Sequence, residues 1–258
     1  MKINGTIEKM RAYPSPNPNV TLTEISYWSE QTLVKGMLAV PKKAGDYDGI
    51  LYLRGGIQGV GMVRPARIAQ FAAEGFIVFA PYYRGNRGGG GRDEFGGIDR
   101  YDAVYGVDVL KQFSNGRTHA FAFSRGGIMA LWTAILRDDV TSVVTWGGVS
   151  DMVLTYEERV DMRRMLKRVI GGSPTKVPEQ YDARTPLYRI EDIHCPVLII
   201  HGEQDDNVSI EHAYRLEAAL TGHHKRYTTM YAPHYTHYYP LAANRQTVRQ
   251  ACQWMQLQ

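Results

Sequence analysis

The spacing of hydrophobic residues changes several times along the chain, and each change predicts a different element. Two segments, 20–29 and 32–41, alternate apolar and polar positions and are separated by two residues, which predicts an antiparallel hairpin. Beyond residue 48, short apolar runs alternate with segments whose apolar residues recur at helical spacing. The expected strands are 49–56, 75–81, 117–123, 141–148, 196–202 and 225–232, and the expected helices are 63–75, 99–114, 126–137, 209–222 and 241–255.

Alternation of strands with helices is typical of an α/β fold, in which a mostly parallel sheet carries helices on both faces. Residues 150–192 interrupt this rhythm with short helical pieces, and we expect a small helical insertion that lies like a lid over one end of the sheet. Residues 1–19 are polar and end in a Pro/Asn-rich stretch, so we expect an N-terminal arm. The remainder, 20–258, is expected to be one domain.

Composition and charge narrow the class of protein. Hydrophobic residues make up 44% of the 258 positions, which is enough for a sizeable core. The net charge is only +4 and no run of five or more Lys or Arg residues occurs, so we expect no nucleic-acid partner. The N-terminus lacks an apolar signal segment, and apolar runs of about ten residues are too short to span a bilayer. We therefore expect a cytoplasmic protein, in which Cys195 and Cys252 are core or half-buried thiols.

The segment FAFSRGG at 121–127 places Ser124 between an expected strand and an expected helix. A nucleophilic serine in such a sharp turn needs small neighbours, and the usual pattern is G-x-S-x-G. Ala122, Gly126 and Gly127 are all small, although alanine replaces the first glycine. The alternative is a serine that only caps an ordinary helix.

A serine hydroxyl needs a base to activate it and an acid to orient that base. Candidates for both follow later strands in the order Ser, Asp, His, which is the order expected for a nucleophile turn on an α/β sheet. The loop after the fifth core strand offers Glu203, Asp205 and Asp206; we favour Asp205, with Asp206 second, against a merely solvated acidic turn. The loop after the last strand offers His234 and His237, of which we favour His237.

Two further motifs could indicate a metal site or a phosphate-binding loop. His234 and His237 form an H-x-x-H pair, but no other His, Cys or Glu set has suitable ligand spacing, so we expect no metal. The glycine-rich GNRGGGG within 83–97 lacks the GK[ST] ending of a phosphate-binding loop and does not open directly into a helix. We expect no cofactor.

Seven segments of the chain share the pattern of one protein family. They are LRGG at 53–56, PYYRGNRGGGG at 81–91, DRYDAVYGVDVLKQF at 99–113, FAFSRGG at 121–127, GVSDM at 148–152, the run from IGG to DDNV at 170–208, and the histidine loop. Together these segments resemble the catalytic α/β-hydrolase domain of the prolyl oligopeptidase family of serine peptidases. The resemblance covers roughly residues 20–255 and implies an α/β-hydrolase fold. It implies Ser124 as nucleophile, Asp205 as orienting acid and His237 as general base, with an oxyanion hole formed by the backbone N–H groups of Arg125 and Gly56.

The chain departs from the family pattern at three positions. Arg54 replaces the usual histidine before the glycine pair, Ile57 follows the pair where proline is common, and Ala122 replaces the first glycine of the turn. We expect Arg54 to be a structural anchor more than a contact for a substrate carboxylate. Family peptidases often carry an N-terminal β-propeller, and only about 20 residues precede the hairpin here, so we expect a free-standing catalytic domain.

These expectations describe a serine hydrolase that forms an acyl-enzyme on Ser124 and cleaves a small ester or short peptide. One alternative is a small-substrate carboxylesterase without peptidase activity. An alternative of another class is a non-catalytic α/β-hydrolase-fold binding protein, because a fold does not determine a function. A homo-oligomer is left open.

Overall fold

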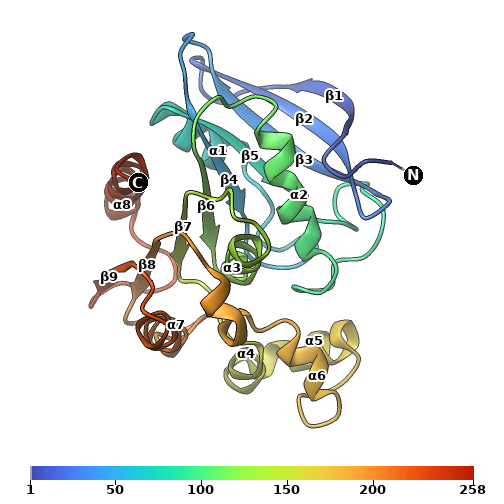
Figure 1. Ribbon diagram of the computed structural model, residues 1–258, viewed down its shortest axis with the longest axis vertical. Helices are drawn as coiled ribbons and strands as arrows, with labels where there is room; N and C mark the ends of the chain where they lie inside the picture. Colours follow the sequence, from blue (N-terminus) through green and yellow to red (C-terminus); the bar gives the residue numbers. More distant parts are fainter. Residues whose placement is uncertain (1) are drawn as a thin grey trace.

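The computed structural model describes residues 2–258, and nine strands of these residues form one sheet (Figure 1). The strand order is β1-β2-β3-β5-β4-β6-β7-β8-β9. The strands are β1 (Ile7–Tyr13), β2 (Val20–Ser29), β3 (Thr32–Pro41), β4 (Asp48–Leu53), β5 (Phe76–Pro81), β6 (Thr118–Phe123), β7 (Ser142–Trp146), β8 (Val197–Gly202) and β9 (Tyr227–Ala232). The helices are α1 (Pro65–Ala73), α2 (Arg100–Leu110), α3 (Gly126–Leu136), α4 (Met152–Glu158), α5 (Arg163–Ile170), α6 (Pro178–Asp182), α7 (Glu211–Gly222) and α8 (Leu241–Gln256), with 3-10 turns at Val160–Met162 and Pro186–Asp192.

The sheet is parallel from β4 to β9, whereas β2 pairs with β3 and β3 with β5 in antiparallel fashion. This confirms the α/β fold predicted from the sequence, with its mostly parallel sheet and N-terminal antiparallel hairpin. The chain runs from β4 outward to β5 and then returns to β6 on the other side of β4. Such a reversal opens a crevice beyond the carboxyl ends of the strands, where ligands commonly bind.

Helices cover both faces of the sheet (Figure 1). Helices α1 and α8 pack on one face and share a core with Phe76, Phe121 and Trp146. Helices α2, α3 and α7 pack on the opposite face, where their apolar side chains meet Leu51, Phe79 and other buried residues. Cys195 is half-buried and Cys252 is buried, and both are free thiols, as expected. Burial raises the pKa of Cys195 to about 11 and that of Cys252 to about 12, so both stay protonated at neutral pH.

An extra strand lies inside the segment expected to be an N-terminal arm. Residues Ile7–Tyr13 form β1, which pairs antiparallel with β2 at the edge of the sheet. Its side chains are mostly exposed, so it lacks the apolar alternation by which a half-buried strand is predicted. Backbone hydrogen bonds to β2, rather than burial, hold this strand in place.

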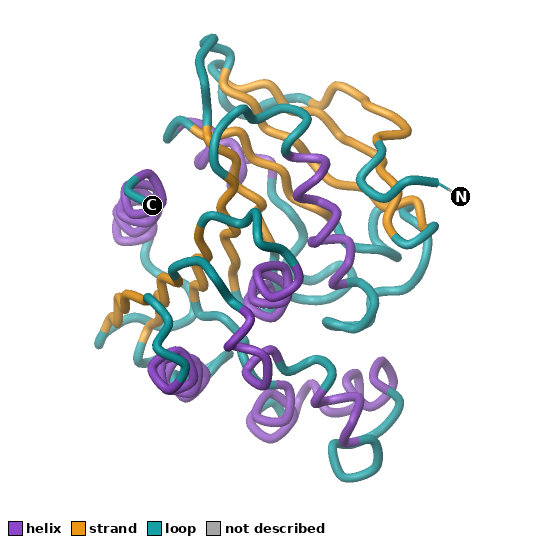
Figure 2. Tube along the Cα trace, viewed as in Figure 1, coloured by secondary structure: helices purple, strands orange, loops and turns teal. Residues whose placement is uncertain are grey.

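Segment 150–192 forms α4, α5, α6 and the two 3-10 turns, and it projects from one end of the molecule (Figures 1 and 2). Its buried residues Leu166, Ile170 and Tyr181 share a third hydrophobic cluster with Ile128 and Trp132 of α3. The segment therefore packs on the helix that begins just after Ser124. Its role as a lid stays a prediction.

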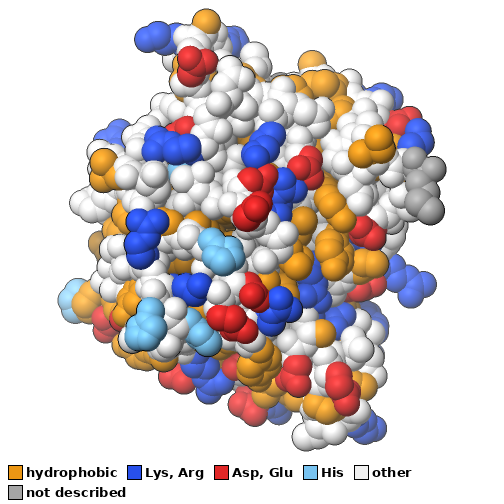
Figure 3. Space-filling model, in the orientation of Figure 1, with side chains coloured by type: hydrophobic (Ala, Val, Ile, Leu, Met, Phe, Trp, Pro, Cys, Tyr) orange, Lys and Arg blue, Asp and Glu red, His pale blue; other side chains and the backbone are white. Residues whose placement is uncertain are grey.

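The distribution of charged side chains on the surface is consistent with the net charge of +4. The face drawn in Figure 3 has Lys and Arg side chains interspersed with Asp and Glu side chains. A basic surface of single sign, which nucleic-acid binding requires, does not appear on this face. Among residues 2–258, the helices are too short or too polar to cross a membrane.

We predict that buried His119, on β6, makes the protein less stable in mild acid. Burial lowers the pKa of His119 from 6.5 to about 4, although the Asp48 carboxylate lies 3.7 Å from its Nε2. The unfolded chain therefore binds a proton in this window that the folded protein does not, and the free energy of unfolding falls as pH drops from 6.5 towards 4. The loss attributable to His119 is about 3 kcal/mol.

Urea unfolding of the parent and of His119→Gln, measured at intervals between pH 4 and pH 8, tests this. The variant should show a shallower decline of unfolding free energy below pH 6.5. Equal pH dependence in the two proteins would contradict the assignment, whatever their absolute stabilities.

Candidate active site

Ser124 occupies a strained turn between β6 and α3. Its φ of 58° lies in the left-handed region, which a non-glycine residue adopts at a cost of about 1–3 kcal/mol. The Ser124 N–H donates to the Trp146 carbonyl at 3.0 Å, and its own carbonyl accepts from the Gly127 and Val149 N–H groups at 2.9 and 3.0 Å. These bonds fasten the turn to β7 and to the start of α3, so the surrounding structure offsets the strain.

The small residues that follow Ser124 are required by close packing of the backbone. A Cβ on Gly126 would come within 2.1 Å of the Leu53 carbonyl oxygen at the end of β4. Ala122, in contrast, is completely buried on β6 between β4 and β7, where its methyl group joins the core. The turn therefore needs glycine two residues after the serine and accepts alanine two residues before it.

The structure brings together Asp205 and His237, which follow β8 and β9. Asp205 Oδ2 lies 2.7 Å from His237 Nδ1, and both side chains are buried. The other carboxylate oxygen, Oδ1, accepts the Asn207 and Val208 N–H groups, each at 2.9 Å, so the carboxylate is fixed in direction. Glu203 and Asp206, the alternative acids, are exposed, and so is His234.

His237 lies beside the turn that holds the serine. Its ring centre is 4.7 Å from that of Phe123, the residue before Ser124. Within residues 2–258 the Ser124 hydroxyl makes no hydrogen bond. Hydrogen bonds of catalytic groups are often long without substrate and tighten only in the complex, so an unbonded Ser124 hydroxyl does not contradict the role predicted for Ser124.

A second buried histidine, which the sequence analysis did not single out, lies next to Asp205. His201 is completely buried on β8, with Nε2 2.8 Å from the Val208 carbonyl and 3.6 Å from Asp205 Oδ2. Burial lowers the pKa of His201, which favours a neutral ring beneath the Asp205 carboxylate. Its packing could not be inferred from sequence, because one histidine in an apolar strand carries no signal of its partner.

The loop after β4 passes directly over Ser124. A Cβ on Gly55 would lie 2.6 Å from the Ser124 Cβ and 3.1 Å from its Oγ, so only glycine allows this approach. Arg54 Nη1 donates to the Gly55 carbonyl at 2.9 Å. The carbonyl and the next N–H of a trans peptide point in opposite directions, so this bond also fixes the direction of the Gly56 N–H.

Arg54 is itself buried and engaged on several sides. It is 2% exposed, it also donates to the Val60 and Tyr82 carbonyls at 3.2 and 3.0 Å, and it lies 3.6 Å from Asp93. These contacts give Arg54 the structural role expected for it and leave its guanidinium committed to the protein rather than to a substrate.

The side chain of Arg125 holds the same loop from below. Its guanidinium is buried between Asp93, at 2.8 Å, and Asp99, and it donates to the Gly56 carbonyl at 2.8 Å. Burial raises the pKa of Asp99 to about 6, against the opposing effect of Arg125. Burial alone would raise the pKa of Asp93 as well, but Arg125 and the Asn86 amide outweigh it and lower that pKa. From the sequence we predicted a role only for the Arg125 backbone. The ion pairs of its side chain with Asp93 and Asp99 were not predicted.

No group of three or more His, Cys, Asp or Glu side chains in the described residues is arranged to hold a metal ion. The two histidines of the H-x-x-H pair differ in environment, since His234 is exposed and His237 is buried against Asp205.

The chain is similar in sequence to known peptidases. The prolyl oligopeptidase family model matches residues 62–258. An uncharacterized peptidase of Bacillus subtilis (strain 168), YtmA, is 56% identical over 253 residues, which cover 96% of this chain and 98% of that protein.

Two solved structures show the same fold at low identity. An acylaminoacyl peptidase in complex with Z-Gly-Gly-Phe-chloromethyl ketone is 18% identical with a TM-score of 0.73, and the match covers 93% of this chain and 40% of that one. An acetyl xylan esterase from Paenibacillus sp. R4 is 14% identical with a TM-score of 0.74, over 96% of this chain and 89% of that one. The chain thus spans less than half of the acylaminoacyl peptidase.

We predict that Arg54→Met slows turnover of p-nitrophenyl acetate without weakening binding. Removing one oxyanion donor costs about 10²–10³ in kcat, and a loosened Gly55–Gly56 peptide should cost part of this, about 10- to 100-fold, with KM little changed. Arg64→Met, at an exposed arginine of the same segment, is the control. A folded Arg54→Met protein with the kcat of the parent would show that the Arg54 contacts do not orient the Gly56 N–H.

Proposed function

The chain belongs to the prolyl oligopeptidase family and is a serine hydrolase, and we propose that Ser124, His237 and Asp205 form its catalytic triad. The observation that carries the proposal is the buried hydrogen bond of 2.7 Å between Asp205 and His237, beside the strained turn that presents Ser124. The family assignment also disfavours the non-catalytic alternative.

In the first half of the reaction, Ser124 Oγ attacks the carbonyl carbon of the substrate and its proton passes to His237. With Nδ1–H donating to Asp205, the neutral imidazole accepts that proton at Nε2. Asp205 then stabilises the imidazolium without becoming protonated. His237 returns the proton to the leaving group, which departs as an alcohol or amine and leaves an ester of Ser124.

Water completes the cycle by the same route in reverse order. It gives a proton to His237 as it attacks the acyl carbon, and Ser124 recovers that proton as the acid product leaves. In both halves the carbonyl oxygen becomes negatively charged, and the backbone N–H groups of Arg125 and Gly56 are the proposed donors to it. The Arg54 and Arg125 side chains hold the loop that carries the second donor.

The substrate is proposed to be a small ester or a short peptide. Resemblance to a B. subtilis protein named as a peptidase supports peptide substrates. The acetyl xylan esterase supports esters through its fold alone, and it is matched over 89% of its length. A carboxylesterase without peptidase activity therefore stays the second candidate.

The triad is tested by pairs of neighbouring substitutions. Ser124→Ala should abolish labelling by a fluorophosphonate probe and reduce turnover of p-nitrophenyl acetate to background. Asp205→Asn and His237→Gln should each lower kcat by about 10³-fold or more, because the base loses its orientation or is absent. The exposed neighbours Asp206→Asn and His234→Gln are matched controls and should leave kcat within about twofold. Loss of activity in the controls with retention in Asp205→Asn or His237→Gln would reverse the assignment.

Substrate class is tested with two sets of chromogenic substrates. We expect the parent to hydrolyse p-nitrophenyl esters faster than alanyl or prolyl p-nitroanilides, since an amine leaving group depends more on protonation by His237. Measurable anilide hydrolysis that disappears in Ser124→Ala would establish peptidase-type activity. Ester hydrolysis with no anilide turnover would favour the carboxylesterase alternative.

A further inference from the structure

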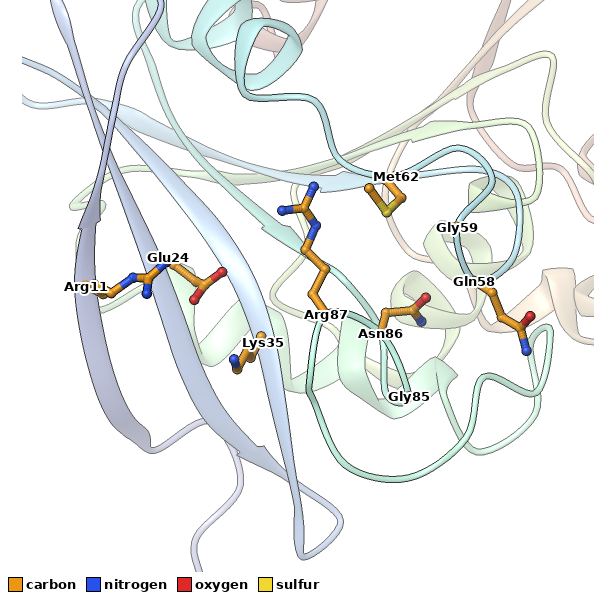
Figure 4. Close-up of a pocket in the computed structure, with 9 residues that line it drawn as sticks. All are labelled: Arg11, Glu24, Lys35, Gln58, Gly59, Met62, Gly85, Asn86 and Arg87. Carbon is orange, nitrogen blue, oxygen red and sulfur yellow. The ribbon is translucent and has the colours of Figure 1, made fainter.

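A cavity of about 660 Å³ lies between the antiparallel strands β1–β3 and the loops that follow β4 and β5 (Figure 4). Small-molecule sites in proteins usually enclose about 300–1,000 Å³, so the cavity is large enough for part of a substrate. In Figure 4 the strand residues Arg11, Glu24 and Lys35 lie on one side of the opening, and the loop residues Arg87, Asn86, Met62 and Gln58 lie on the other. The side chains that matter are Arg11, Glu24, Lys35, Gln58, Met62 and Arg87.

The cavity is cationic. Arg11, Lys35 and Arg87 contribute three positive charges and Glu24 one negative charge, a formal balance of 3 − 1 = +2. Within residues 2–258 none of the three cations lies within ion-pair distance of a carboxylate. The buried network behind the cavity does not cancel this charge, because its two arginines are balanced by two aspartates.

A buried hydroxyl without a partner lies beside these charges. Tyr82, just after β5, is 2% exposed, and its hydroxyl has no hydrogen-bond partner in residues 2–258. The Arg87 guanidinium lies 5.4 Å from the centre of the Tyr82 ring. Burial raises the pKa of Tyr82, and the Glu24 carboxylate raises it further, whereas the Arg87 guanidinium opposes this rise.

The cavity is separated from Ser124 by a single loop. The loop begins at Gly55, in contact with Ser124, and continues into Gln58 on the cavity wall. Asp93 connects the two sides, since it accepts from the Asn86 amide of the cavity at 3.1 Å and pairs with Arg125 at 2.8 Å.

Sheet order fixes which part of a substrate could reach the cavity. The cavity lies on the β3–β5 side of Ser124, whereas Asp205 and His237 follow β8 and β9 on the other side. The leaving group must lie next to His237, which protonates it. The cavity is therefore on the side available to the acyl portion.

We propose that this cavity is a subsite for a carboxylate on the acyl portion of the substrate, held by Lys35, Arg87 and Arg11; the assignment to the acyl portion rests on the proposed triad. Guanidinium and ammonium groups bind carboxylates through charge-assisted hydrogen bonds, which are roughly twice as strong as neutral ones. The exposed Gln58 side chain provides an uncharged donor at the same wall.

The test compares mono-p-nitrophenyl adipate, whose distal carboxylate is charged, with its methyl ester, in which that carboxyl is methylated and neutral. We expect the parent to prefer the acid in kcat/KM, and this preference to shrink as salt is added, because the cations are solvent-accessible. Lys35→Met and Arg87→Met should each lower kcat/KM for the acid by about tenfold and leave the methyl ester within about twofold. Lys43→Met, at an exposed lysine in the turn between β3 and β4 outside the cavity, is the matched control and should alter neither substrate.

A binding measurement separates this proposal from the proposed triad. Ser124→Ala should bind mono-p-nitrophenyl adipate in a calorimetric titration, and Ser124→Ala/Lys35→Met should bind it about tenfold more weakly. If the parent hydrolyses neither ester but this binding difference is found, the subsite stands and the proposed function fails. If both esters are hydrolysed equally, or Ser124→Ala binds the acid no better than the methyl ester, the subsite is overturned and the triad is untouched.

Discussion

The site depends on the buried ion pairs and the hydrogen bond that the Arg125 guanidinium makes. The guanidinium lies out of water between Asp93 and Asp99 and donates to the Gly56 carbonyl, while its own backbone follows Ser124. One residue therefore joins the serine turn, the loop over it and the loop that carries both aspartates. A buried ion pair contributes little net stability, but removing one partner leaves an uncompensated charge in the interior and is strongly destabilising. The ion pairs of Arg125 therefore contribute mainly by fixing the positions of the serine turn and of the loop over it.

The second constraint is steric. Three backbone segments, the loop after β4, the serine turn and the end of β7, meet so closely that side chains are excluded where they cross. A strained residue persists only where its surroundings hold it in place, and here hydrogen bonds from β7 and α3 do so. The parallel strands then bring loops that are distant in sequence to one edge, with Asp205 and His237 on one side of Ser124 and the cationic cavity on the other.

Features encoded by neighbouring residues could be predicted from the sequence. The alternation of strands and helices follows from apolar periodicity, and the serine turn follows from Ala122, Gly126 and Gly127, because both depend on local backbone and burial. Strand β1 could not be predicted in this way, since an exposed edge strand has no apolar face to display. Strands β4, β5, β6, β7 and β8, in contrast, are almost entirely buried, and their apolar runs made them predictable.

What the sequence determined by itself was the α/β fold and a short set of candidates: one serine, three acids in one loop and two histidines in another. Only the tertiary structure decided that Asp205 rather than Asp206 meets His237, that Arg54 is committed to backbone carbonyls, and that Arg125 acts through its side chain as well as its backbone. It also assembled the cavity from three strands and two loops. The reason is physical. Which polar groups pair is settled by what is buried beside them, and those neighbours are brought together by the fold from positions far apart in the chain.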